Sequence, residues 1–155
     1  MSSRRVHGWF LLAVCIGCAT VLSAKDRGRG APGPFQTHVD MKTFMEHVIS
    51  PSAAIIWRVN GILFDDKGEH DLGPRSDADW EQIVSGAATL AEATNALMIP
   101  QRVRDSQWAI YVRPLSIAAD LAYRAAESRD LPALSKVSDE LDGICSACHR
   151  HYGVE

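Results

Sequence analysis

Apolar and polar residues alternate with a helical period along most of this chain. In four segments the apolar residues recur every three or four positions, the spacing that places side chains on one face of an α-helix. These segments cover residues 38–60, 76–97, 105–125 and 130–152. No stretch alternates with a period of two over a useful length, so the pattern predicts helices rather than strands.

The first of these segments contains a proline, and a loop follows it. Pro51 has no backbone N–H to donate, so the helix over residues 38–60 is expected to kink there or to restart with Ser50 as its cap and Pro51 in its first turn. Residues 61–75 are rich in glycine and acidic side chains and have no apolar period. They predict a surface loop.

Capping signals mark the starts of the other three helices. Ser76, followed three residues later by Asp79, is typical of a capping box. The third helix is expected to begin with Asp105 or Ser106 as its cap, and the fourth with Asp130. Because short connections favour antiparallel neighbours, the sequence predicts an all-α, up-down-up-down four-helix bundle.

The start of the chain has the pattern of an export signal. Arg4 and Arg5 precede an uncharged apolar run from Trp9 to Ala24, which is short for a membrane-spanning helix and ends in small residues. We therefore expect a signal peptide over residues 1–24, export to the bacterial periplasm, a flexible lead-in over 25–36 and one folded domain over 37–155.

Two cysteines lie in this leader, and they leave one alternative open. Cys15 and Cys18 are expected to be discarded with the signal peptide, but a lipid attached to Cys18 would instead tether the protein to a membrane. Cleavage after Ala24 would remove two arginines and no acid, and the formal charge would change from −3 to −5. An acidic domain of this kind argues against nucleic-acid binding and favours protein partners with a basic surface.

The most informative motif lies near the end of the fourth helix. Cys145-Ser146-Ala147-Cys148-His149 is a C-x-x-C-H run, the attachment signature of a c-type haem. On a helix, the two cysteines and the histidine occupy positions i, i+3 and i+4 and therefore project from one face. Each sulfur can form a thioether with a haem vinyl group while the imidazole reaches the iron. The motif predicts one covalently bound haem c.

Other interpretations of the two cysteines are weaker. A thiol-redox C-x-x-C motif belongs at the start of a helix beside a sheet, whereas this one lies at the end of a predicted helix. A structural zinc site needs about four ligands, and the rest of the predicted domain holds only scattered histidines. A disulfide between Cys145 and Cys148 would close a very small, strained loop.

A predicted four-helix bundle whose last helix ends in Cys145-x-x-Cys148-His149 resembles the class II c-type cytochromes, the cytochrome c′ and cytochrome c-556 group. The resemblance covers roughly residues 37–152. It implies that the haem lies inside the bundle, that His149 is its proximal ligand and that a residue of the first helix faces the other side of the iron. The position similar to that distal residue is Met45. The family often has a basic residue four positions after the haem histidine, where this chain has Gly153.

The identity of the distal residue separates two functions. Ligation by Met45 gives a low-spin iron of raised potential, suited to an electron carrier that exchanges electrons with redox partner proteins and is not an enzyme. If Met45 only packs over the haem, the iron is five-coordinate and open to nitric oxide or carbon monoxide. Met41, one turn earlier, and the more distant Met98 are substitute ligands. A haemless structural bundle is the third alternative.

The remaining candidate residues have less specific roles. His47 is expected to point to solvent, because it lies two positions from Met45 on the helix. Members of the similar family often pair through their first two helices, so a homodimer is a further expectation. Large aromatic residues could line a haem pocket or the core, and several arginines could pair with haem propionates: Trp57, Trp80, Trp108, Arg102, Arg104 and Arg113.

Overall fold

The structure is a computed structural model that describes residues 35–154. This part of the chain is mostly helical and carries one small two-stranded sheet. The helices and strands are α1 (Met41–Phe44), a π-helical turn η1 (Met45–Ile49), α2 (Ser50–Trp57), a 3₁₀ turn η2 (Arg58–Asn60), β1 (Ile62–Asp65), β2 (Gly68–Asp71), α3 (Asp77–Leu97), α4 (Trp108–Glu127) and α5 (Leu131–Tyr152). The predicted signal peptide with Cys15 and Cys18 lies outside the described residues.

The first predicted helix is continuous in direction but changes its hydrogen bonding ahead of Pro51. Between α1 and α2, η1 is π-helical, and the Ser50 N–H donates to the carbonyl of Met45, five residues earlier. A wider turn relieves the clash that the proline ring would make with the carbonyl of His47. The alternative of a restart with Ser50 as cap is wrong, because Ser50 has helical dihedral angles.

The starts of the other helices follow the sequence signals in two of three cases. Ser76 and Asp79 form the predicted capping box, and the Asp130 carboxylate accepts the N–H of Ala133. The prediction that Asp105 or Ser106 caps the third helix is wrong, because α4 begins only at Trp108. The Asp105 carboxylate instead accepts the N–H of Gln107 at 2.8 Å and shapes the turn before the helix.

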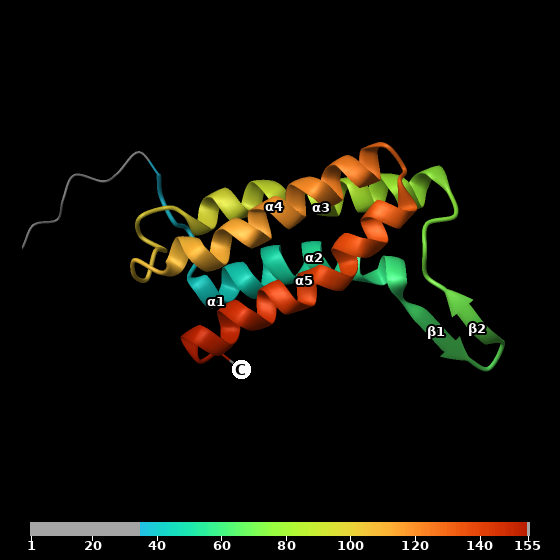
Figure 1. The fold of residues 1–155 in the computed structure, drawn as a ribbon, viewed down its shortest axis with the longest axis horizontal. Helices are drawn as coiled ribbons and strands as arrows, with labels where there is room; N and C mark the ends of the chain where they lie inside the picture. Colours follow the sequence, from blue (N-terminus) through green and yellow to red (C-terminus); the bar gives the residue numbers. More distant parts are fainter. Residues whose placement is uncertain (1–34, 155) are drawn as a thin grey trace, which may run out of the picture. The chain divides into compact units, whose positions relative to one another are not determined.

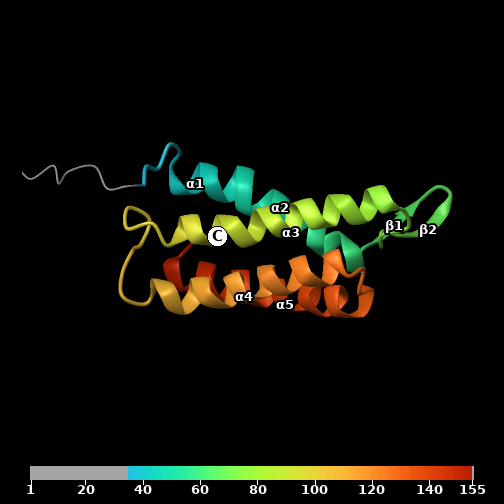
Figure 2. The same cartoon turned by 90° about the horizontal axis from the view of Figure 1, so that it is seen from above.

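The four helical segments run alternately in opposite directions, as Figures 1 and 2 show. Each packs against two others, since α2 contacts α3, α3 contacts α4, α4 contacts α5 and α5 contacts α2. The prediction of four antiparallel helices is therefore confirmed for the described residues. The core between them contains large, fully buried side chains from α2, α3 and α5, including Ile56, Leu90, Leu97, Leu134 and Leu141, while α4 contributes small buried residues such as Ala119 and Ala122.

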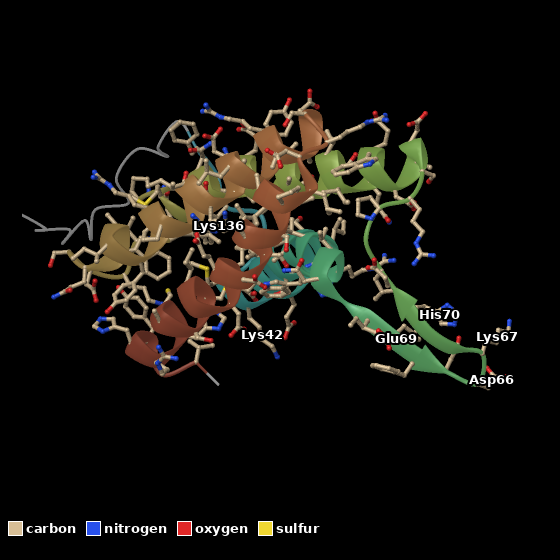
Figure 3. The ribbon with its side chains drawn as sticks, turned by 45° about the vertical axis from the view of Figure 1, so that its right-hand side comes forward. Lys42, Asp66, Lys67, Glu69, His70 and Lys136 are labelled. Atoms are coloured by element: carbon tan, nitrogen blue, oxygen red, sulfur yellow. The ribbon has the colours of Figure 1, made fainter. Side chains whose placement is uncertain are left out.

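The predicted loop at 61–75 is wrong in part, because it contains a β-hairpin. β1 pairs antiparallel with β2, with Ile62 opposite Asp71 and Asp65 opposite Gly68. The tip is closed by a turn in which the Asp65 carboxylate accepts the N–H of Lys67. The hairpin extends away from the helices, with the side chains of Asp66 and Lys67 at its far end (Figure 3). Four-residue strands exposed on both faces carry no alternating pattern that a sequence could reveal.

A polar junction fixes the position of α5 along its length relative to the first helical segment, residues 41–60. The Asn60 side chain donates to the carbonyl of Ser135 at 2.9 Å and to the carboxylate of Asp139 at 2.7 Å. The Ser135 hydroxyl donates back to the Asn60 side chain at 2.6 Å. Since this junction joins η2 to the beginning of α5, the antiparallel direction brings the end of α5 opposite α1 and η1.

Candidate functional site

The end of α5 presents the C-x-x-C-H motif from a helix whose first half is firmly packed. Leu134, Val137 and Leu141 are buried in the core at helical spacing. The same stripe continues to Cys145 and Cys148, which are half-buried, as is His149. The predicted common face of the two thiols and the imidazole therefore borders the space between the helices.

That space is a cleft that brings together the predicted site residues. Cys145, Cys148 and His149 line it from α5, and Met45 lines it from η1. The inner hollow of the cleft has a cavity volume of about 70 Å³, and a second, outer hollow of about 460 Å³ continues from it. The two hollows share Met45, Ser50, Trp108, Cys148 and His149, so they form one continuous opening, here named the α5 cleft.

The three methionine candidates are placed differently. Met45 lies at the start of the π-helical turn, is partly buried against the core and lines both hollows of the α5 cleft. Met41 lines only the outer hollow. Met98 lies just after α3, is 42% exposed and lines neither hollow. The geometry thus favours Met45 over Met41, and both over Met98, as the residue facing His149.

The walls of the cleft are apolar and aromatic, with one unsatisfied donor. The inner hollow is lined by aliphatic side chains of α2, α3, α4 and α5 together with Trp57, Trp108 and Tyr111. Trp108 donates its indole N–H to the carbonyl of Leu97 at 2.8 Å. The indole N–H of Trp57 is buried and has no hydrogen-bond partner among the described residues. A buried donor without a partner costs free energy unless a bound group satisfies it, which fits a site built for a large ligand.

The two thiols have the electrostatics of buried, neutral groups. Burial raises the pKa of Cys145, and the charge of Asp142 raises it further. Burial also raises the pKa of Cys148, although the nearby Arg104 opposes the rise. Neither is therefore an activated thiolate, which disfavours a thiol-redox role. Both cysteines are free, without a disulfide between them.

A hydrogen bond and an aromatic cluster fix the helix end that carries His149. The Tyr152 hydroxyl donates to the Asp105 carboxylate at 2.9 Å, and its ring lies 5.2 Å from that of Trp108 between centroids. Gly153 ends α5 in the left-handed conformation, with φ of 63°, and its N–H donates to the carbonyl of His149. Glycine adopts this positive φ without strain, which suits it to end the helix.

We expect Tyr152 to titrate at unusually high pH. Burial and the bond to Asp105 raise its pKa from 10.0 to about 12, so its contribution to folding is complete below pH 10 and is lost as the pH rises through about 12. Ultraviolet titration of tyrosinate, with circular dichroism to follow folding, should show a late component that belongs to Tyr152. The late component should disappear in Tyr152→Phe and move toward ordinary pH in Asp105→Asn. An unchanged titration in Asp105→Asn would contradict this assignment.

Two cations lie at the mouth of the α5 cleft: Arg104, which the sequence had named as a candidate, and Lys42, which it had not. Lys42 and Arg104 both line the outer hollow, and the Arg104 guanidinium lies 5.3 Å from the centre of the Tyr152 ring. Arg102 is used elsewhere, because it is buried, lies 4.1 Å from the centre of the Phe44 ring and donates to the Ala96 carbonyl. The sequence missed Lys42 because helical spacing alone does not identify the face that borders a cleft.

The other histidines of residues 35–154 line neither hollow of the α5 cleft. His47 is exposed, as predicted. His70 is on the hairpin, where its Nε2 lies 3.0 Å from the Asp65 carboxylate. His151 is exposed and stacks on Tyr111 with ring centroids 4.7 Å apart. None of them joins His149 at the site.

Comparisons with family models, curated proteins and solved structures found no match to this chain. Within residues 35–154, no three histidine, cysteine or acidic side chains are grouped closely enough to bind a metal ion by themselves. In the same part of the chain, no helix combines the length and apolar character needed to cross a membrane.

Proposed function

We propose that this protein is an exported monohaem c-type cytochrome of the class II kind, in which a four-helix bundle encloses the haem and the protein acts as an electron carrier. The observation that carries the proposal is the convergence of four side chains on one cleft. Cys145, Cys148 and His149 reach it from α5, and Met45 reaches it from η1. Two thiols, an imidazole and a thioether are the groups that bind haem c covalently and ligate its iron from both sides.

The residues of the cleft fit this group in three respects. The two thiols would hold the haem by thioether bonds. In each, the S–H group adds across a vinyl double bond, with the sulfur bonding to one carbon and the hydrogen to the other. His149 would be the proximal ligand, with its helix end held by Tyr152 and the cap at Gly153. The buried indole N–H of Trp57 offers a donor that lacks a protein partner.

The rest of the cleft would serve electron transfer rather than turnover of a substrate. When bound, the haem supplies reversible one-electron oxidation and reduction. The apolar walls would exclude water and, with two fixed protein ligands, keep the surroundings nearly unchanged as the charge changes. Lys42 and Arg104, at the mouth, would meet the anionic propionates. The net negative charge favours redox partner proteins with a basic surface.

Export is part of the proposal. In bacteria whose c-type cytochromes carry a similar motif, haem is attached outside the cytoplasm. The test is expression of the full-length chain in a bacterium with a haem-attachment system, followed by denaturing electrophoresis, haem staining and intact-mass measurement. We expect a stained band in the periplasmic fraction, with the mass of one added haem and an N-terminus after Ala24. A colourless band of unmodified mass would reject the proposal, and a lipid on Cys18 would reject its soluble periplasmic location.

A further inference from the structure

The outer face of α4 carries a stripe of apolar side chains that the core does not use. Ile110 and Ile117 are each 62% exposed and Leu121 is 47% exposed, and Pro114 is also exposed between them. These four residues, here named the α4 stripe, are separated by four, three and four positions. This spacing is typical of the apolar side by which one helix pairs with another. None of them lines the α5 cleft. The stripe is thus separate from the proposed haem site.

A groove runs beside the α4 stripe, between α4 and α5. Ile110 and Pro114 line it from α4, and Gly143 and Ala147 line it from α5. A side chain added at Gly143 would meet nothing within 4 Å, so the groove is open above that residue. Small residues four positions apart on α5 leave room for the side chains of an approaching helix.

We propose that the α4 stripe is the interface of a homodimer in which the α4 helices of two copies of this chain pair antiparallel. The 4-3-4 spacing reads the same in both directions, so an antiparallel copy matches it without change. Ile110 would face the partner's Leu121, and Pro114 would face the partner's Ile117. The same four residues of both copies would then form the contact, which is the reciprocal arrangement that a two-fold axis requires.

The charges beside the α4 stripe favour a second copy over another partner. Arg113 and Asp120 each directly precede a stripe residue, on the side away from the groove. Antiparallel pairing would bring Arg113 of each copy close to the partner's Asp120. The dimer would therefore contain two such ion pairs, and each copy would supply one positive and one negative side chain. Asp120 already accepts two hydrogen bonds from Arg124 and retains free acceptor positions for a second arginine. The surface is therefore complementary to itself in both apolar pattern and charge.

The alternative faces of the molecule do not offer a comparable surface. The resemblance to class II cytochromes led us to expect a dimer through the first two helices. In the described part of the chain, however, none of the large exposed apolar side chains belongs to α2 or α3. Exposed apolar residues on the hairpin, such as Phe64, form no helical stripe. We therefore assign the dimer contact to α4.

The test is the mass of the purified full-length product in solution, measured by light scattering and sedimentation equilibrium over a wide concentration range. We expect a dimer, and Ile117→Glu should raise its dissociation constant about thirtyfold or more, because a charge would replace a central apolar contact. Ala54→Glu on α2 and Ser85→Glu on α3, both at exposed positions, are the matched controls and should leave the dimer intact. Circular dichroism should show the same helix content in every variant.

A charge exchange tests the pairing direction. Asp120→Arg alone should weaken the dimer, and adding Arg113→Asp should restore it, which a loss of folding would not do. The inference fails if the protein stays monomeric at every concentration, or if an α2 or α3 variant dissociates the dimer while Ile117→Glu does not. It does not depend on haem, because a colourless protein that dimerises through α4 would support it while rejecting the proposed function.

Discussion

Replacing Cys145 and Cys148 together by serine should abolish covalent haem attachment while leaving the helices folded. The two thiols are half-buried at the edge of the α5 cleft, and serine preserves their size closely enough to keep the packing of α5. Denaturing electrophoresis with haem staining should therefore show a colourless band at wild-type protein levels. Each single serine variant should retain one thioether and stain the band more weakly.

The matched control for this experiment is Ser146→Ala, which lies within the same turn of α5 but is absent from both hollows of the cleft. It should stain like the wild type. Covalent haem in the double variant would mean that other residues hold the haem. Since Cys145 and Cys148 are the only cysteines of residues 35–154, that outcome would remove the basis of the proposed site.

Replacing Met45 by alanine should convert a six-coordinate, low-spin haem into a five-coordinate or water-ligated one. The oxidised wild type should show the weak sulfur-to-iron absorption band of methionine ligation, and the variant should lack it. Loss of the thioether ligand should also lower the reduction potential on the order of 0.1 V, a fraction of the roughly 0.8 V range that axial ligands span. Optical spectra and a redox titration measure both effects, and covalent haem attachment should be unchanged.

The other two methionines are the controls. Met98→Ala should leave the spectrum unaltered, because Met98 lines no part of the α5 cleft. Met41→Ala should also retain the sulfur-to-iron band, since Met41 reaches only the outer hollow. A band that persists in Met45→Ala and vanishes in Met41→Ala would transfer the ligand role to Met41. A wild-type spectrum that is already high-spin would instead favour the gas-binding alternative, with Met45 packing over the haem.

Much of the helical structure follows from local patterns that the sequence displays openly. The capping box at Ser76 and the cap at Asp130 depend on side chains within three residues of the helix start, so sequence spacing suffices to find them. The start of α4 could not be found in this way, because no side chain caps that helix. Asp105 is recruited by Tyr152, which is remote in sequence, and by the turn that joins α3 to α4.

The two apolar faces of α4 show a second limit to what the sequence can predict. Its period predicts an inner face with Leu115 and Ala122, both of which are buried. The period does not show that Ile110 and Ile117, on another face, remain exposed, because apolar residues in a helix look alike until their neighbours are known. Only the positions of the other helices reveal that this stripe has no partner within the described chain.

The sequence by itself determined the four helices and the grouping of Cys145, Cys148 and His149 on one face, because a helix fixes the geometry of residues three and four positions apart. Only the tertiary structure decided that Met45, rather than Met98, shares the cleft with them. That choice depends on the offset between α5 and the first helical segment, which the bonds of Asn60 set across the fold. It also depends on the π-helical turn before Pro51, which relieves the clash of the proline ring and which no apolar period encodes.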